Sequence, residues 1–394
     1  MPLSLPAYRQ EVRQELDRIL QYWQTYSPDN QNGGFYGRVG LDNQPDPTAA
    51  KAIVLNSRIC WTFSAAYRLY KKKEHLALAK RAYDYIYAYF RDPDYGGVYW
   101  EVKADGSPLV TKKQLYGNAF AIYGLSEYYR ASGDKAALDF AISLWKLAEK
   151  YAFDPARGGY IEAFERDWSG TTEYILCRGD RRKSMNTHLH LIEAFTNLYR
   201  VWKDKTLHKQ IVGMLETAFE KHIIDPKTYR MHLFLGEDWS VKSEEISYGH
   251  DIEASWLLVE TAETLEDKPL LERIKKLSIN MAKAAADGIA PDKGMNYEYN
   301  PITKQLNTER SWWVMTEAMV GFLNAYQLTG KVHFLEKSTH AWEFTKQYLL
   351  DYKGGEWRTG VTAEHTPIGN STISAWKCPY HNARACMEVM RRLG

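Results

Sequence analysis

Histidines spaced for proton transfer stand at the start of several apolar, helix-like stretches of this sequence. His250 and Glu253 are three residues apart, and Asn186 and His190 are four apart, so each pair lies on one face of a helix. His381 stands in the same way at the start of the last such stretch. Imidazole exchanges protons near neutral pH, so histidines brought together from different helices are suited to general acid–base catalysis.

The first turns of these stretches also carry polar and aromatic side chains that are unusual in a helix core. Arg58 lies among Leu55, Ile59 and Trp61, and Tyr116 opens another stretch of the same kind. If all the helices start at one rim of the molecule, these side chains converge on a single cavity. A polar cluster drawn from every helix is difficult to attribute to core packing. The further members of the group are Asn118, Trp312, Trp313, Glu317, Tyr380, Asn382 and Arg384, together with Trp376, which stands just before the last stretch.

Each of these residues also has a purely structural explanation. A single histidine on an apolar helix is more often a hydrogen-bonded core residue than a catalyst. We prefer this explanation for His188, which is two positions from His190 and therefore points about 200° away from it. On the same basis, Arg58 would belong to a buried ion pair. The tryptophans Trp312, Trp313 and Trp376 would be core residues.

Two other kinds of chemistry fit the pattern less well. A metal site would use histidines and carboxylates, but the sequence has no HExxH motif and no close pair of histidines on one helix face. A glycosidase would use paired carboxylates, and the acidic residues of the first turns are few, namely Asp251, Glu253 and Glu317. We therefore expect no metal and no cofactor, and no Rossmann glycine motif is present for a nicotinamide.

A short passage, glycine-rich in most copies, returns six times along the chain, at intervals of about 60 residues. Most copies follow an acidic or Asp-Pro turn, and two amphipathic stretches of helix length lie between consecutive copies. Self-similarity at a fixed period indicates a repeat architecture, and six units of two helices predict a closed ring of helical hairpins. The copies are 33–36, 96–100, 158–160, 229–232, 293–297 and 354–357.

Apolar spacing and capping residues predict twelve helices of two alternating kinds. The charge-rich kind is expected on the outside, at about 4–25, 74–91, 135–151, 205–223, 268–287 and 332–349. The other kind is apolar on most of its surface and is expected in an inner ring, at about 51–72, 112–132, 184–203, 247–266, 311–329 and 378–392. The sequence thus predicts an all-α fold in a single domain, 1–394, with short β-hairpins at one rim.

Composition narrows the classes of partner. The chain has 394 residues, with 51 basic and 49 acidic side chains and no basic run, so we expect no nucleic acid partner. It has no apolar run long enough for a membrane span, and its N-terminus lacks the apolar core of a signal peptide. The four cysteines lack metal-site spacing and are expected to be free thiols. We expect a soluble, cytoplasmic monomer or weak homo-oligomer.

The strings that carry these residues resemble the N-acylglucosamine 2-epimerase superfamily along the whole chain. They are 55–63, 185–190, 249–256, 312–313 and 379–382, and the string Gly-His-Asp-Ile-Glu-Ala-Ser-Trp at 249–256 is similar in particular to the cellobiose-epimerising members. The resemblance implies an (α/α)6 barrel and a cofactor-independent isomerase. Its substrate would be a β-1,4 disaccharide with a free reducing end, whose reducing-end glucose is inverted at C2. Cellobiose would give glucosylmannose, and lactose would give epilactose.

The resemblance also implies a role for each candidate residue. After ring opening, His381 would remove the C2 proton of the glucose form, and His250 would return one to the other face of the enediolate. Arg58 and His190 would stabilise the negative charge that builds on the enediolate oxygens. The sugars would be bound by Tyr116, Asn186, Glu253, Trp312, Trp313 and Trp376. The stretch 171–183 matches poorly, and a family aspartate in this region maps to Asp180 or to nothing.

Several alternatives stay open at the level of sequence. The first is a monosaccharide aldose–ketose isomerase or an N-acylglucosamine 2-epimerase of the same superfamily. The second is a glycosidase or lyase built on the same ring of helices. The third is a glycan-binding protein without activity, which the histidines placed for proton transfer disfavour.

Overall fold

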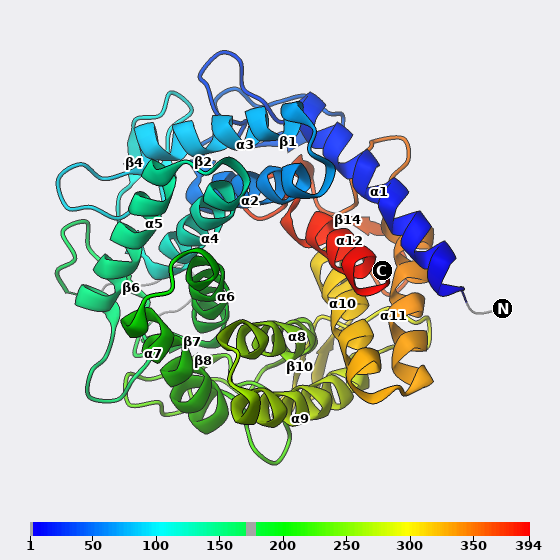
Figure 1. Ribbon diagram of the computed structural model, residues 1–394. Coiled ribbons are helices and arrows are strands. Elements are labelled where there is room, and N and C mark those ends of the chain that lie inside the picture. The colour runs from blue at the N-terminus through cyan, green and yellow to red at the C-terminus, as the bar shows by residue number, and fades with distance from the viewer. Residues whose placement is uncertain (1–2, 171–178) are drawn as a thin grey trace.

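The computed structural model describes residues 3–170 and 179–394, and in these residues twelve α-helices form two concentric rings (Figure 1). The inner ring consists of α2 (Ile53–Tyr70), α4 (Leu115–Ser132), α6 (Met185–Val201), α8 (Tyr248–Leu265), α10 (Trp312–Thr329) and α12 (Tyr380–Arg392). The outer ring consists of α1 (Leu5–Tyr26), α3 (Lys73–Tyr85), α5 (Lys135–Leu147), α7 (Lys205–Gly213), α9 (Lys268–Ala285) and α11 (Val332–Phe344). Helix α1 packs against α12, which closes the ring. The predicted (α/α)6 barrel is confirmed.

The burial of the two kinds of helix differs as their composition predicts. In α2, every residue from 53 to 64 is buried, and in α10 every residue from 312 to 325 is buried. In the outer helix α9, by contrast, the buried residues recur every three or four positions, so only one stripe of the helix faces the core. The inner helices therefore carry the core on all sides, and side chains in their first turns face a common axis.

The outer helical segments end within one residue of the predicted positions, but in five of them the last part is not an α-helix. Four of them continue into a wider π-helical turn, and α9 continues into a 3₁₀ turn. Such turns redirect the chain where a regular α-helix would carry on. The π-helical segments are η1 (Ile86–Phe90), η2 (Ala148–Ala152), η3 (Met214–Ile223) and η5 (Thr345–Leu349), and the 3₁₀ segment is η4 (Ala286–Gly288).

Short antiparallel strand pairs link each repeat to the next at one rim. The strand that directly precedes an inner helix pairs with a strand of the following repeat, and the last pair, β15 with β1, joins the end of the chain to its start. The pairs are β2 (Lys51–Ala52) with β3 (Glu101–Val102), β5 (Lys113–Gln114) with β6 (Ala163–Phe164), β7 (Lys183–Ser184) with β8 (Phe234–Leu235), β9 (Ile246–Ser247) with β10 (Glu298–Asn300), β12 (Arg310–Ser311) with β13 (Gly360–Val361), and β15 (Ser371–Ile373) with β1 (Val39–Gly40). Three further strands, β4 (Pro108–Val110), β11 (Gln305–Asn307) and β14 (Pro367–Ile368), extend β3, β10 and β13. The inner helices begin one to three residues later than predicted, and in all but α12 the residues just before the helix are strand.

The acidic turns noted in the sequence have a structural role at this rim. In three of these turns, and at Glu356 of the sixth passage, the carboxylate holds a buried lysine that stands just before an inner helix, so a charge that would be costly to bury alone is paired. The Nζ–carboxylate distances are 2.8 Å for Lys51 and Asp29, 2.8 Å for Lys113 and Asp92, 2.9 Å for Lys183 and Asp154, and 2.9 Å for Lys377 and Glu356. These pairs fix the entry of the inner helices and hence the positions of their first turns.

One glycine of the repeated passage shows why the residue is required. Gly159 has a φ of +75°, and a Cβ at this position would lie 2.8 Å from Nε2 of His188. The backbone conformation and the close approach of the histidine both exclude a side chain here.

Candidate active site

A cavity of about 440 Å³ lies among the first turns of the inner helices, on the same side as the strand pairs, and we call it the rim cavity. Its volume is in the range of small-molecule sites. All ten residues proposed from the sequence line it: Arg58, Tyr116, Asn186, His190, His250, Glu253, Trp312, Trp313, Trp376 and His381. Three residues that the sequence analysis did not propose also line it, namely Tyr297, Glu309 and Ser311.

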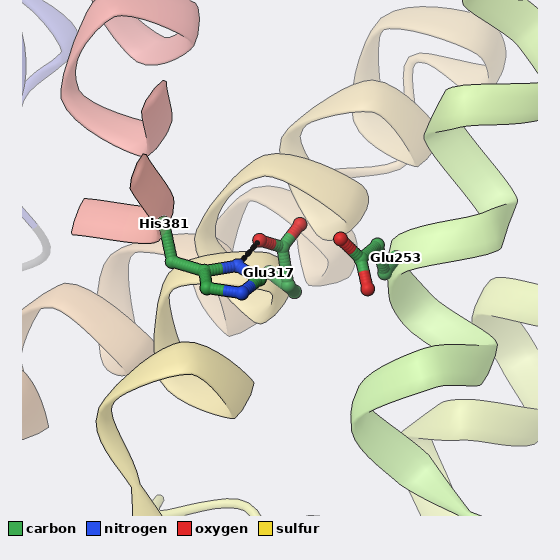
Figure 2. Close-up of side chains that lie close together, drawn as sticks. All are labelled: Glu253, Glu317 and His381. Atoms are coloured by element: carbon green, nitrogen blue, oxygen red, sulfur yellow. Dashed lines mark hydrogen bonds and ion pairs between the residues drawn. The ribbon is translucent and has the colours of Figure 1, made fainter. Parts of the chain in front are cut away.

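His381 is held by a carboxylate. Its Nδ1 lies 2.7 Å from Oε1 of Glu317, as Figure 2 shows. A carboxylate accepts, so Nδ1 carries the proton and Nε2 keeps a lone pair. Burial lowers the pKa of His381 well below its usual value, and the positive charges of Arg58 and Arg384 lower it further. At neutral pH the ring is therefore a neutral base with a fixed orientation.

His250 has a different partner. Its Nδ1 lies 2.7 Å from the hydroxyl oxygen of Ser247, the last residue of β9. Its ring centroid is 4.7 Å from that of Trp313, and the His381 ring is 5.8 Å from the same tryptophan. Burial lowers the pKa of His250 to about 3, and His190 contributes to the shift. Two neutral imidazoles, from α8 and α12, thus lie against the same tryptophan of α10.

The two histidines of α6 have separate roles, as the helical spacing predicts. His190 lines the rim cavity, and its Nδ1 lies 3.0 Å from Oε2 of Glu193. His188 faces the outer layer, where its Nε2 accepts a hydrogen bond from the Tyr160 backbone N–H at 2.9 Å and its Nδ1 lies 2.7 Å from the Ser184 carbonyl oxygen. The structural explanation of His188 is confirmed.

Arg58 is a buried cation without a carboxylate partner among the described residues. Its side chain is buried, its Nη2 donates to the Tyr116 hydroxyl at 3.0 Å, and its Nη1 lies 3.5 Å from the Cys378 sulfur. The guanidinium lies over the rings of Phe120 and Tyr380, with centroid distances of 4.2 and 4.9 Å. The explanation of Arg58 as half of a buried ion pair is therefore wrong. Its charge faces a cavity in which an anion would complete the pairing.

Three buried carboxyl groups bond Arg384 next to the rim cavity. One guanidinium nitrogen, Nη2, donates to Oε1 of Glu253 and to Oε1 of Glu317, each at 2.7 Å, and Nη1 bonds Glu193. These groups come from α6, α8, α10 and α12. The sequence analysis singled out Glu317 and Arg384 only as polar residues of the first turns, because no spacing along one helix reveals a cluster shared by four.

Glu253, Glu317 and His381 also form the group that would come nearest to a metal site in the described residues, with candidate ligand atoms within 4.8 Å of one another (Figure 2). The short distances have another cause. Arg384 already donates to both carboxylates, and His381 donates to Glu317. A cation at this point would have to displace a guanidinium from both carboxylates.

Aromatic rings line the outer part of the rim cavity. Trp312 and Trp313 are largely buried, whereas Trp376 is 37% exposed. The rings of Tyr297 and Trp313 meet edge to face, with 5.7 Å between their centroids. Tyr297 is the last residue of the fifth repeated passage, 293–297. Tyr297 and Glu309 flank the β10–β11 hairpin, and the repeat pattern, which places such hairpins above the inner helices, is the signal that would have indicated them.

The poorly matching stretch contributes nothing to the rim cavity in its described part. Residues 171–178, which include Cys177 and Arg178, lie outside the described residues. Asp180 is described, is exposed, and forms an ion pair with Lys242 at 2.6 Å. It does not line the rim cavity.

Comparison with known proteins defines the class to which this fold and site belong. The model of the N-acylglucosamine 2-epimerase family matches residues 34–385. The chain belongs to this family, and it is an isomerase of the epimerase type.

Two similar relatives of this chain are cellobiose 2-epimerases. A cellobiose 2-epimerase from Bacteroides fragilis is 44% identical over 386 residues, covering 97% of this chain and 98% of the relative. One from Ruminococcus albus is 40% identical over 387 residues, with 97% and 98% covered. The resemblance stated from the sequence is thus confirmed, including its emphasis on the cellobiose-epimerising members.

Solved structures agree with the fold. The cellobiose 2-epimerase of Spirochaeta thermophila superposes with a TM-score of 0.93 at 38% identity, covering 99% of this chain and 97% of that one. A D-mannose isomerase superposes with a TM-score of 0.86 at 20% identity, covering 98% and 99%, and this match speaks for the fold alone. Among the described helices, none is long and apolar enough to cross a membrane.

Proposed function

We propose that this isomerase inverts C2 of the reducing-end glucose of β-1,4-linked disaccharides, converting cellobiose to glucosylmannose and lactose to epilactose. The observation that carries the proposal is the pair of neutral imidazoles, His250 and His381, around Trp313 in one cavity. Inversion requires a base and an acid on opposite faces of one carbon, and two histidines from different helices supply them. The names of the relatives point to the same substrate class.

The proposed reaction starts from the open-chain aldehyde, because only then is the C2 proton acidic. Nε2 of His381 takes the proton, the electrons of the C–H bond form the C1–C2 double bond, and negative charge develops on O1. His381 is suited to this step because Glu317 stabilises the imidazolium that forms. His250 is neutral at the start, takes the O1 hydroxyl proton as the sugar ring opens, and then delivers that proton to C2 from the other face. The proton on His381 returns to O1 as the ring closes, and the ring oxygen takes up a proton from water on opening and releases it on closure.

Arg58 supports the intermediate in this proposal. A buried guanidinium without a carboxylate partner in the described residues is a fixed donor that needs no reorganisation when an oxyanion forms. His190 lines the same cavity beside Tyr116, at 5.1 Å between ring centroids. The sequence analysis expected it to stabilise negative charge with Arg58, but its Nδ1–H donates to the Glu193 carboxylate, so the Nε2 of the neutral ring would accept from a sugar hydroxyl. The first turns of the inner helices add positive potential around both.

The rim cavity holds further polar atoms that a sugar would satisfy. Oδ1 of Asn186 and Nε1 of Trp312 are buried and have no hydrogen-bond partner among the described residues. Unpaired buried polar groups are costly, so their presence in a binding site indicates a ligand that bonds them. We assign them to hydroxyls of the reacting glucose, with Trp312 and Trp313 beside it and the exposed Trp376 stacking on the second sugar at the mouth.

The proposal needs neither a cofactor nor a metal. Hydrolysis by paired carboxylates is disfavoured by the bonds of the acidic residues: Asp251 accepts from the Met231 backbone N–H at 3.0 Å, and Glu253 and Glu317 share Arg384. We also propose that the whole chain, 1–394, acts as one catalytic domain, because the β15–β1 pair joins its two ends.

One experiment tests this function. The protein is incubated in D₂O with cellobiose, lactose, glucose, mannose or N-acetylglucosamine, and products are followed by NMR. We expect epimerised disaccharides with deuterium at C2. Fast turnover of mannose to fructose with little use of disaccharides would assign a monosaccharide isomerase, turnover of N-acetylglucosamine alone would assign that epimerase, and free glucose from cellobiose would assign a hydrolase.

A further inference from the structure

Three buried carboxyl groups share a single guanidinium behind the rim cavity. Glu193, Glu253 and Glu317 are all bonded by Arg384, and each of the four side chains is at most 3% exposed. With every carboxyl ionised, the cluster would carry two uncompensated negative charges in a buried site, which is costly. A proton held by one of the three carboxyls would reduce this cost.

Hydrogen bonds show which two carboxyls are ionised. Glu317 accepts from His381 and Arg384 at Oε1 and from the Trp256 indole N–H at Oε2, at 3.0 Å. Glu193 bonds Arg384 and the Tyr380 hydroxyl at Oε1 and His190 at Oε2. Both oxygens of each group are occupied by donors, which is the environment of a carboxylate.

Glu253 differs from both. Its Oε1 accepts one bond, from Arg384, and its Oε2 has no hydrogen-bond partner among the described residues, although the side chain lines the rim cavity. We propose that Glu253 is a neutral carboxylic acid whose Oε2–H donates a hydrogen bond to an oxygen of the enediolate. This inference rests on the proposed function and adds a catalytic donor to it, beside Arg58.

The electrostatics of Glu253 agree with its hydrogen bonds. Burial raises the pKa of Glu253 to about 8, and repulsion from Glu317 adds to the effect. Burial also acts to raise the pKa of Glu193, but Arg384 and His190 hold it at about 2. A carboxylic acid kept neutral in this way can act as an oxyanion donor at neutral pH.

Among the titratable groups near Glu253, we expect Glu253 itself to lose its proton in the mildly alkaline range. These groups come from every inner helix: Arg58, Tyr116, His190, Glu193, His250, Glu317, Tyr380, His381 and Arg384. The three histidines have lowered pKa values, and the pKa of each tyrosine is raised above its usual value. Burial also raises the pKa of Glu317, but Arg384 and the Trp256 indole N–H act against this shift and favour its ionised form. A loss of activity above pH 8 that disappears in Glu253→Gln would therefore report on Glu253.

Isosteric variants test the assignment. Glu253→Gln keeps a neutral donor toward the cavity and a carbonyl toward Arg384, so we expect kcat/KM for cellobiose to fall only about 5- to 10-fold, since an amide is the weaker donor. Glu317→Gln removes the negative charge that stabilises the His381 imidazolium and sets an amide N–H₂ against one of the donors His381, Arg384 and Trp256, so it should lower kcat/KM about 10²- to 10⁴-fold. In the wild type, kcat/KM should fall about tenfold per pH unit above pH 8, and Glu253→Gln should lack this decline.

Infrared difference spectra of wild type against Glu253→Gln give a readout that does not depend on turnover. We expect the C=O band of a protonated carboxyl in the wild type at pH 7, absent from the variant and lost above pH 8. Absence of the band, or a Glu253→Gln variant as impaired as Glu317→Gln with its alkaline decline retained, would overturn the proposal. If the wild type shows the band but does not epimerise cellobiose, the proposed function fails while the protonation of Glu253 stands.

Discussion

The two ends of the barrel hold two cavities that differ in how their charges are used. The rim cavity is the smaller, at about 440 Å³, and a cavity at the other end, which we call the far cavity, measures about 640 Å³. The last turns of the inner helices line the far cavity, which is rich in charge. Its arginines are mostly paired: Arg68 and Arg130 with Glu127, Arg200 with Glu260, and Arg391 with Glu388, at 2.6 to 2.7 Å.

The rim cavity is arranged in the opposite way. Arg58 has no carboxylate partner in the described residues, and Asn186 and Trp312 each keep a buried polar atom without a bond. Arg384 lines the far cavity and bonds three carboxyl groups, one of which, Glu253, lines the rim cavity. Volume and charge alone would favour the far cavity, so unused hydrogen-bonding capacity is the better mark of a site.

The histidines should show the largest effect. His250→Ala or His381→Ala removes one of the two groups that exchange a proton with C2, so epimerisation should fall about 10²- to 10⁴-fold or more. Deuterium exchange at C2 in D₂O and circular dichroism should be measured together. Turnover near the wild-type value in either variant would contradict the assignment.

A matched pair of arginine variants compares the two cavities directly. Arg58→Lys replaces a planar donor in the rim cavity by a point charge and should lower kcat about 10²- to 10³-fold. Arg200→Lys makes the same change in the far cavity, where the residue is paired with Glu260 at 2.7 Å, and turnover should be unchanged. If both variants lowered kcat by the same factor, Arg58 would have no special role in turnover and the two cavities would not differ in this respect.

A smaller effect is expected at the mouth of the rim cavity. Trp376→Ala removes a ring that is 37% exposed but no proton-transfer group. Loss of one stacking platform should raise KM for cellobiose about 2- to 10-fold, with glucose less affected. Steady-state kinetics on both sugars check this. Equal losses on the two would place Trp376 beside the reacting sugar.

His188 should affect stability and leave turnover of the folded protein unchanged. Burial lowers its pKa to about 4, so below pH 6.5 the unfolded chain takes up a proton that the folded chain does not, and stability falls as pH decreases from 6.5 toward 4. His188→Gln should cost roughly 1–3 kcal/mol of unfolding free energy at pH 7.5, because its hydrogen bonds are weakened. The difference from wild type should narrow at pH 5, as urea unfolding would show. A gap that widens at pH 5 would contradict a neutral buried His188.

Local patterns in the sequence determined much of the architecture. The repeated passages and the two kinds of apolar spacing depend on residues close together in the chain, and they predicted the order of the helices, the inner and outer rings and the rim where the strands lie. First-turn positions then placed all ten proposed residues, from Arg58 to His381, in one cavity. The same spacing separated His188 from His190, because the direction of a side chain on a helix follows from its number.

Tertiary structure decided the partners of those residues. Glu317 and His381 meet only when α10 and α12 take their rotation about the barrel axis, and Arg384 reaches carboxylates from three other helices. The absence of a carboxylate partner for Arg58 in the described residues depends equally on the closed ring. Hydrogen bonds and charges act over a few ångströms in space, and positions up to 191 residues apart in the chain enter this cluster, so spacing alone does not reveal which groups are paired.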